Sequence, residues 1–305
     1  MVVAWVNGNL TSIQAKGFDV SGTTTPATIS SQVTASGTSY IYFKPSVAIN
    51  DNNFAIAWSQ SRRNFGTYDY DIYGRVGYIS NSLFPSFYFS GSDARIHADD
   101  TASLGYAIDQ TLPSIAANSS SGSTGSGFIG VWNKSNYSTD SINGFNSSGT
   151  PTTLGYNSIQ GKIATPYNSN NYTAVWKDNA TNDIYAKRYT GSSIYASSTI
   201  NTTTTGVQEF PAVATDGSHI VVVWQGPDGS GNGVYAQIYD ISSGTFGTPK
   251  FSSDILVNTT TTGDQSNPSV AMDQNGNFVV TWLGFNSTSS YDIYAQRFDV
   301  NGNKL

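Results

Sequence analysis

The chain has 305 residues, a net charge of −6 and no cysteine, and only 11% of its residues are charged. The scarcity of Lys and Arg argues against nucleic-acid binding, which needs a dense cationic surface. The lack of cysteine excludes disulfides and thiolate metal sites. No apolar run approaches the roughly 20 residues of a membrane helix, so we expect no membrane insertion.

Six tryptophans mark a repeated strand along the chain. Each ends a short apolar stretch, from "MVVAW" and "NFAIAW" near the start to "HIVVVW" and "NFVVTW" near the end. A second strand follows, as in "DIYGRVGY" or "DIYAQRFD", where Ile or Val precedes a small residue by two positions and so shares its face. The small residue leaves room for a large neighbour, which predicts that the tryptophans form the core: Trp5, Trp58, Trp132, Trp176, Trp224 and Trp282.

Two further strands complete the repeat. Before five of the tryptophan strands stands a segment such as "PSVAI" or "PAVAT", joined to it by an Asn, Asp and Gly turn that is typical of a hairpin. A weaker fourth strand is visible in "ARIHA", "ASSTIN" and "DILVN". Runs such as "HIVVVW" are apolar on both faces, which predicts that the sheets are stacked. The sequence therefore predicts an all-β fold, a β-propeller of six blades with four antiparallel strands each.

The predicted blades form a single domain, 1–305, with repeats at approximately 1–43, 44–110, 111–158, 159–208, 209–265 and 266–305. The first repeat begins at its tryptophan strand and the last ends before its fourth strand, so both terminal blades are predicted to be incomplete. Three explanations stay open. The chain belongs to a longer protein, its ends close the ring in another way, or another copy of the chain donates a strand by β-strand addition.

The best-preserved repeats, within Asn201–Leu305, read "NTTTTG", then "PSVAMDQNGNFVVTW" and "DIYAQRFDVNG". This pattern resembles a repeat of large bacterial surface and secreted proteins of adhesin type. The resemblance implies an extracellular or cell-surface propeller module that serves attachment or builds a surface assembly. Its implied partners are other surface proteins or glycans, and it brings no catalytic residues.

Candidate catalytic groups are few. A propeller glycosidase needs two carboxylates, but the twenty acidic residues include one glutamate, Glu209. Asp216 and Asp273 recur at one position of the repeat, which is typical of turn-forming residues. The two histidines, His97 and His219, form no pattern with a nucleophile or a metal. The sequence therefore favours a protein that is not an enzyme, with a divergent glycosidase as the less favoured alternative.

A cation site is suggested by "DGSGNG", which matches the front of a calcium loop with Asp228, Ser230 and Asn232 as ligands. The acidic residue expected at the twelfth position is replaced by Tyr239. A glycine-rich turn that binds no metal explains the same residues. Structural calcium is thus the one cofactor that we consider.

Glycan binding by a lectin-like propeller is the alternative to attachment. The polar segments that follow the tryptophan strands, predicted to be loops, contain aromatic and cationic side chains suited to sugar stacking and hydrogen bonding. The candidate residues are Arg62, Arg63, Tyr68, Tyr70, Tyr137 and Tyr291.

Overall fold

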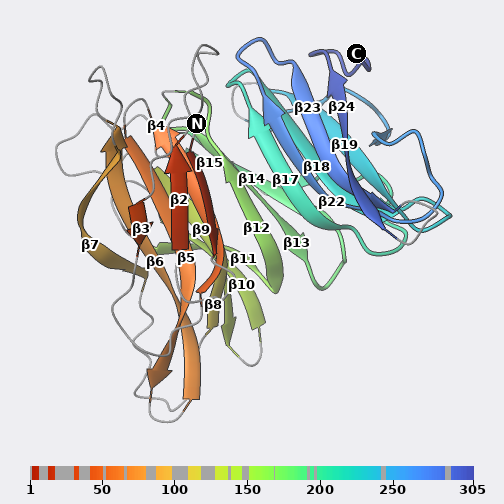
Figure 1. Ribbon diagram of the computed structural model, residues 1–305. Coiled ribbons are helices and arrows are strands. Elements are labelled where there is room, and N and C mark those ends of the chain that lie inside the picture. Colours follow the sequence, from red (N-terminus) through yellow and green to blue (C-terminus); the bar gives the residue numbers. More distant parts are fainter. Residues whose placement is uncertain are drawn as a thin grey trace. The chain divides into compact units, whose positions relative to one another are not determined.

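A computed structural model shows the chain as two compact units, 1–153 and 154–305, which are described here each by itself (Figure 1). The structure describes residues 2–6, 13–17, 31–33, 42–50, 53–64, 67–79, 87–97, 109–117, 128–136, 139–145, 151–167, 169–190, 193–195, 198–241, 245–285 and 290–305. Within these ranges every regular element is a strand, and no helix is present that could span a membrane.

The first three sheets are antiparallel and follow one another in the chain. The first contains β1 (Val2–Val6), β2 (Ile13–Gly17) and β3 (Ser31–Val33). The second contains β4 (Tyr42–Asn50), β5 (Asn53–Asn64), β6 (Thr67–Ile79) and β7 (Phe87–His97). The third contains β8 (Asp109–Ala117), β9 (Phe128–Asn136), β10 (Thr139–Phe145) and β11 (Pro151–Tyr156), whose last residues belong to the second unit.

The other three sheets repeat the pattern. The fourth contains β12 (Ser158–Ala164), β13 (Tyr172–Asp178), β14 (Ile184–Thr190), β15 (Ser193–Ile194) and β16 (Ser198–Thr199). The fifth contains β17 (Glu209–Thr215), β18 (His219–Pro227), β19 (Asn232–Asp240), β20 (Thr248–Pro249) and β21 (Ile255–Leu256). The sixth contains β22 (Gln265–Met272), β23 (Phe278–Phe285) and β24 (Tyr291–Phe298).

Within each unit, consecutive sheets lie against one another through their first strands. In the first unit β4 contacts β8, and in the second β12 contacts β17, which contacts β22. This is the stacking that the doubly apolar strands predicted, and the fold class is the all-β propeller. As expected, the first and last sheets have three strands each among the described residues.

The fifth sheet shows why its middle strand is apolar on both faces. Val222 and Trp224 pack on one side with Val175 and Ile184 of the fourth sheet. The alternate residues, represented by Val221, pack on the other side with Phe278 and Trp282 of the sixth sheet. Because successive side chains of a strand point to opposite faces, the single run "HIVVVW" supplies two cores.

Five of the six tryptophans lie in the core, as predicted, with at most 7% of their surface exposed: Trp58, Trp132, Trp176, Trp224 and Trp282. Trp5 is an exception, since 39% of it is exposed, and its prediction as a core residue was wrong. The reason is its position on β1, the edge strand of a sheet in which no described strand pairs with the outer side of β1. An edge strand lacks the neighbour that covers its equivalents elsewhere.

The segment after the second tryptophan strand also differs from our expectation. The stretch "SQSRRNFGTYDYD", predicted to be a loop, continues the two strands β5 and β6, which pair as far as Asn64 and Thr67. The alternation of Tyr and Asp in "TYDYD" is a period of two, which favours a strand. The high polarity of the segment concealed this signal.

The repeated segment "NTTTTG" begins with an asparagine whose side chain completes the edge of a sheet. Asn201 accepts a hydrogen bond at Oδ1 from the backbone N–H of Ile184 at 2.7 Å, and Asn258 accepts one from Val234 at 2.7 Å. Both asparagines are buried and also donate to a threonine carbonyl of their own linker. The asparagine therefore caps the edge of the third strand where the short fourth strand ends.

The same linker then secures the tryptophan of the next sheet. The indole N–H of Trp224 donates to Gln208 Oε1 at 3.0 Å, and that of Trp282 donates to Gln265 Oε1 at 3.0 Å. Gly226 provides the space, because a Cβ there would lie 2.0 Å from Gln208 Oε1. The linker from this asparagine to this glutamine therefore completes the edge of one sheet and anchors the tryptophan of the next.

The capping role predicts the effect of Asn258→Ala. The substitution leaves the buried N–H of Val234 without its partner, which costs about 1–3 kcal/mol of unfolding free energy. Urea unfolding should show this loss for Asn258→Ala and almost none for Asn275→Ala, whose side chain is exposed. Equal stability of the two variants would show that the asparagine is not a cap.

Candidate functional site

The first strand of five sheets contains a bulge at the same place. The pairing with the tryptophan strand shifts register there, for example between Glu209 and Ala212 in β17. The central residue has a positive φ that side-chain-bearing residues rarely adopt, and the five are Lys44, Leu112, Gln160, Phe210 and Asn267. Four of them precede a proline. Because the bulge recurs, it belongs to the architecture, and what differs between the copies is its side chains.

In the second unit these bulges are linked by side-chain hydrogen bonds. The backbone N–H of Phe210 donates to Gln160 Oε1 at 2.6 Å, so the fourth sheet holds the bulge of the fifth. The backbone N–H of Asn267 donates to Gln225 Oε1 at 2.9 Å, so the fifth sheet holds the bulge of the sixth. We call Gln160, Glu209, Phe210 and Asn267 of the first strands, together with Gln225 of the adjoining strand β18, the first-strand row.

Glu209 is the carboxylate of this row. It lies opposite Gln225 on the neighbouring strand, and its Oε1 accepts a hydrogen bond from Gln225 Nε2 at 3.1 Å. The amide of Gln225 is buried and engaged at both ends, whereas Glu209 is half-buried. The equivalent positions of the other bulged sheets carry Phe43, Thr111, Ile159 and Ser266. Glu209 therefore stands at a repeat position that has no other acidic residue.

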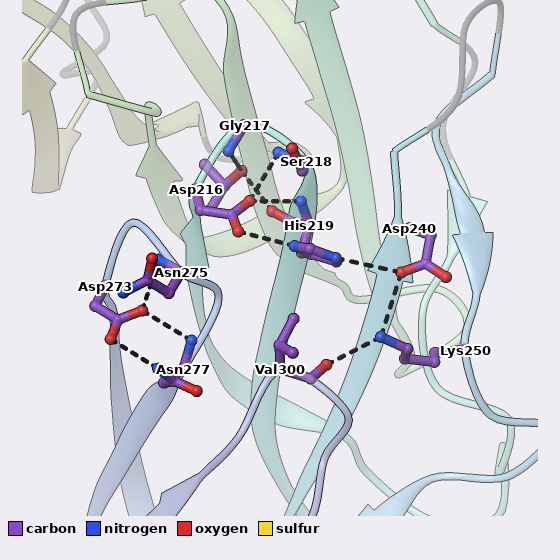
Figure 2. A network of polar contacts seen from close by, with 11 residues as sticks. Asp216, Gly217, Ser218, His219, Asp240, Lys250, Asp273, Asn275, Asn277 and Val300 are labelled. Carbon is purple, nitrogen blue, oxygen red and sulfur yellow. Dashed lines mark hydrogen bonds and ion pairs between the residues drawn. The ribbon is translucent and has the colours of Figure 1, made fainter.

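A second polar network lies at the opposite end of β17 and β18 and is drawn in Figure 2. His219 Nδ1 lies 2.8 Å from Asp216 Oδ2, and His219 Nε2 lies 3.7 Å from Asp240 Oδ1. Lys250 lies 3.6 Å from Asp240 and donates to the carbonyl of Val300 at 3.0 Å. This arrangement joins β18 and β19 of the fifth sheet to the turn that follows β24.

The acidic residues of this network shape turns, as the sequence indicated. Asp216 Oδ1 accepts from the backbone N–H groups of Ser218 and His219, and Asp273 Oδ1 accepts from those of Asn275 and Asn277. Such bonds stabilise a hairpin locally. Because they use the carboxylates for structure, we do not place a reaction here.

The hydrogen bonds change the acidity of Asp216. Partial burial acts to raise the pKa of its carboxyl group, but bonds from the His219 side chain and from the backbone of His219 and Ser218 outweigh this effect. The net result is a pKa below the ordinary value of 3.8.

The loop proposed for calcium forms a tight turn. Asp228 Oδ1 accepts from the backbone N–H of Ser230, and the N–H of Asp228 donates to the carbonyl of Gly231. The N–H of Asn232 donates to Asp264, and the described residues contain no group of three acidic or histidine ligands. Asp228 Oδ2 is buried without a hydrogen bond. Calcium at Asp228, Ser230 and Asn232 stays a prediction.

The structure describes five of the six residues proposed for glycan stacking, and they fall into two places. Arg62, Arg63, Tyr68 and Tyr70 share the β5–β6 hairpin, where Arg63 lies opposite Tyr68. Tyr291 begins β24, is 55% exposed and contacts the ring of Phe285 edge to face.

Tyr137 lies outside the described residues.

The sequence interpretation missed the first-strand row, although one signal was present, namely a single glutamate at a repeat position that is otherwise not acidic.

Comparison with known proteins gives a likeness of fold. No family model and no curated protein matches the chain. A solved protein of unknown function from Dyadobacter fermentans is 13% identical, with a TM-score of 0.54, over 94% of this chain and 82% of that one.

Two enzymes are also similar. An exo-1,5-α-L-arabinanase from a bovine ruminal metagenomic library is 12% identical, with a TM-score of 0.40, over 86% of this chain and 95% of that one. An exo-β-1,3-galactanase from Phanerochaete chrysosporium is 10% identical, with a TM-score of 0.44, over 98% of this chain and 64% of that one.

Several similar solved structures are described as glycoside hydrolases or related sugar-cleaving enzymes, so the expectation of a non-enzymatic attachment or structural module is contradicted, although the likeness itself is one of fold. The expectation was drawn from the repeats, which report on the scaffold. A scaffold does not decide whether a site is present. The question must be answered from residues that do not recur.

The lowered pKa of Asp216 predicts an acid-dependent stability. A group with a depressed folded-state pKa stabilises the fold above its unfolded pKa, and this contribution disappears as the pH falls through the folded pKa. The unfolding free energy of the wild type should therefore decrease from pH 5 to pH 2.5. The unfolding free energy of Asp216→Asn should decrease less steeply over the same range. Urea unfolding across this range measures the slopes. Identical slopes for wild type and Asp216→Asn would contradict the assignment.

Proposed function

We propose that the chain cleaves glycosidic bonds, with Glu209 as the acid that protonates the leaving oxygen. The observation that carries the proposal is the place of Glu209. It is the one glutamate of the chain, it lies on the first strand of its sheet, and Gln225 fixes it through a single oxygen. Its other oxygen, Oε2, makes no hydrogen bond to the described residues, so it can face a substrate.

The neighbours of Glu209 have the chemistry of a sugar site. Sugar-binding pockets combine a few convergent polar groups with apolar ring faces. Gln160 and Asn267 place amide-bearing residues on the sheets on either side, and Asn267 is exposed. Phe210, half-buried beside Glu209, supplies a ring. These residues would bind the hydroxyl groups of an oligosaccharide, while Glu209 protonates the bond to be broken.

The reaction follows from this role. Glu209 donates its proton to the glycosidic oxygen, and the bond from the anomeric carbon to that oxygen breaks. A water molecule then adds its hydroxyl to the anomeric carbon as the new reducing end, and the proton that the water loses restores the acid form of Glu209. The mechanism also needs a second carboxylate as base or nucleophile. Glu209 performs the acid step, and the amides orient the sugar.

A substrate panel with Glu209→Gln tests the proposal. Release of reducing sugar should be measured on plant and microbial polysaccharides and on aryl furanosides and pyranosides. For the best substrate, Glu209→Gln should lower kcat by about 100-fold or more, because general acid catalysis contributes factors of this size. KM should change little, since the substituted amide keeps its shape.

The matched control is Asp240→Asn, which removes one carboxylate at the other end of the same sheet and should keep wild-type kcat. The proposal fails if the wild-type chain hydrolyses none of the panel, or if Glu209→Gln retains full activity.

A further inference from the structure

A lysine is buried in the fourth sheet at a repeat position that carries no charge in the other sheets. Lys177 directly follows the tryptophan of β13, and only 9% of its surface is exposed. The residues that follow the other five tryptophans are Val6, Ser59, Asn133, Gln225 and Leu283. Burying a charge is costly unless it is paired, so the repeat does not explain a lysine at this place.

The side chain of Lys177 lies between the fourth and fifth sheets. Lys177 stands opposite Ile184 and two residues after Val175, so the three side chains share one face of the sheet. Val175 and Ile184 pack on that face with Trp224 of the fifth sheet. Lys177 therefore faces the fifth sheet, just as its repeat equivalent Gln225 faces the sixth.

Another residue performs the structural task of this position in the fourth sheet. Gln225 accepts the backbone N–H of Asn267 in the next bulge, but a lysine ammonium has no acceptor. The equivalent N–H, that of Phe210, donates to Gln160 instead. Lys177 is thus not needed to hold the bulge of the fifth sheet.

The ammonium group of Lys177 has hydrogen-bonding capacity left over. Its Nζ donates to Asn179 Oδ1 at 3.3 Å, and this is its one hydrogen bond in the described part of the chain. No carboxylate of the described residues forms an ion pair with it. Because an ammonium has three donors, an anionic ligand finds two of them available and compensates the buried charge.

Lys177 lies at the same end of the stack as Glu209. Lys177 stands opposite Ile159, which is the counterpart of Glu209 in the fourth sheet. Packed sheets are about 10 Å apart, so a group bound to Lys177 is about one sheet away from the bond that Glu209 protonates. An oligosaccharide that extends along the first-strand row brings a neighbouring sugar to Lys177.

We propose that Lys177 binds the carboxylate of a uronic acid, so that the glycan bound by the chain is an acidic one. The identification of the ligand as a sugar rests on the proposed function, whereas the requirement for an anion rests on Lys177. The ammonium donates to the carboxylate oxygens, and such charge-assisted hydrogen bonds are about twice as strong as neutral ones. A sulfate ester carries a comparable charge, so the experiment includes a sulfated sugar.

Calorimetry with matched pairs of sugars tests the proposal. The protein is the full chain with Glu209→Gln, which should bind glycans without cleaving them. The probes are oligomers of galacturonate, glucuronate and mannuronate, each compared with its methyl ester, which lacks the negative charge. We expect one acid to bind at least about tenfold more tightly than its ester, because a hydrogen bond to a charged group has an energy of this size. Added salt should weaken the binding of the acid only.

The variants to compare in this protein are Lys177→Met, which keeps a long apolar side chain, and Lys162→Met at an exposed lysine of β12. Lys177→Met should lower the affinity for the acid to that for the ester, and Lys162→Met should leave it unchanged. Urea unfolding without ligand verifies the fold. Lys177→Met should be at least as stable as its parent, because it removes an uncompensated buried charge.

The proposal is overturned if no acid binds, if each acid binds no better than its ester, or if Lys177→Met keeps the parent's affinity. Tighter binding of a sulfated oligosaccharide than of every uronate would also overturn it. Failure of the proposed cleavage gives a different result. If the wild type hydrolyses none of the probes but binds an acid through Lys177, the anion site stands and the role of Glu209 as an acid is refuted.

Discussion

The structure depends on one constraint, the pairing of backbone groups at the edge of every sheet. The fourth strand of a sheet is shorter than the third, so it cannot pair with all the backbone N–H and carbonyl groups along the edge of the third strand. The groups that it leaves unpaired need other hydrogen-bond partners. Asn201 and Asn258 provide these partners with a side-chain oxygen 2.7 Å from the N–H. The linker that contains the asparagine also carries the glutamine that holds the next tryptophan. Each sheet is thus completed by the same few residues that position its successor, which explains why the sequence is repeated there.

The bulge of the first strand applies the same constraint within the stack. A positive φ at a residue with a side chain is costly, and the turned N–H needs an acceptor. Gln160 and Gln225 supply it from the neighbouring sheet, at 2.6 and 2.9 Å. The consequence is a line of polar side chains along the bulges of consecutive first strands, to which β18 contributes Gln225. A repeat that solves a structural problem in this way also creates positions where a chemically active side chain can be introduced without disturbing the fold.

The sequence predicted the parts of the fold that residue type alone encodes. The apolar strands ending in Trp58 or Trp224 and the turns at Asp216 or Asp273 were recognisable because hydrophobic period and turn chemistry are local. The bulges were not, because Lys44, Leu112 and Phe210 differ in chemical type, and the proline that follows each of them does not by itself signal a positive φ. The bonds from glutamine to tryptophan were also missed, since their partners lie 16 or 17 residues apart, although the glutamine recurs at that distance. The exposure of Trp5 depends on a missing neighbour, which the residue itself cannot report.

The repeat itself is the means of separating structure from function. Aspartates that recur, such as Asp216 and Asp273, make equivalent turn bonds and are explained by the scaffold. The bulge forms in other sheets without a glutamate, because Phe43, Thr111 and Ser266 occupy the equivalent position there. Its selection is therefore not explained by folding, whereas its carboxylate, fixed at one oxygen and open at the other, is what an acid catalyst requires.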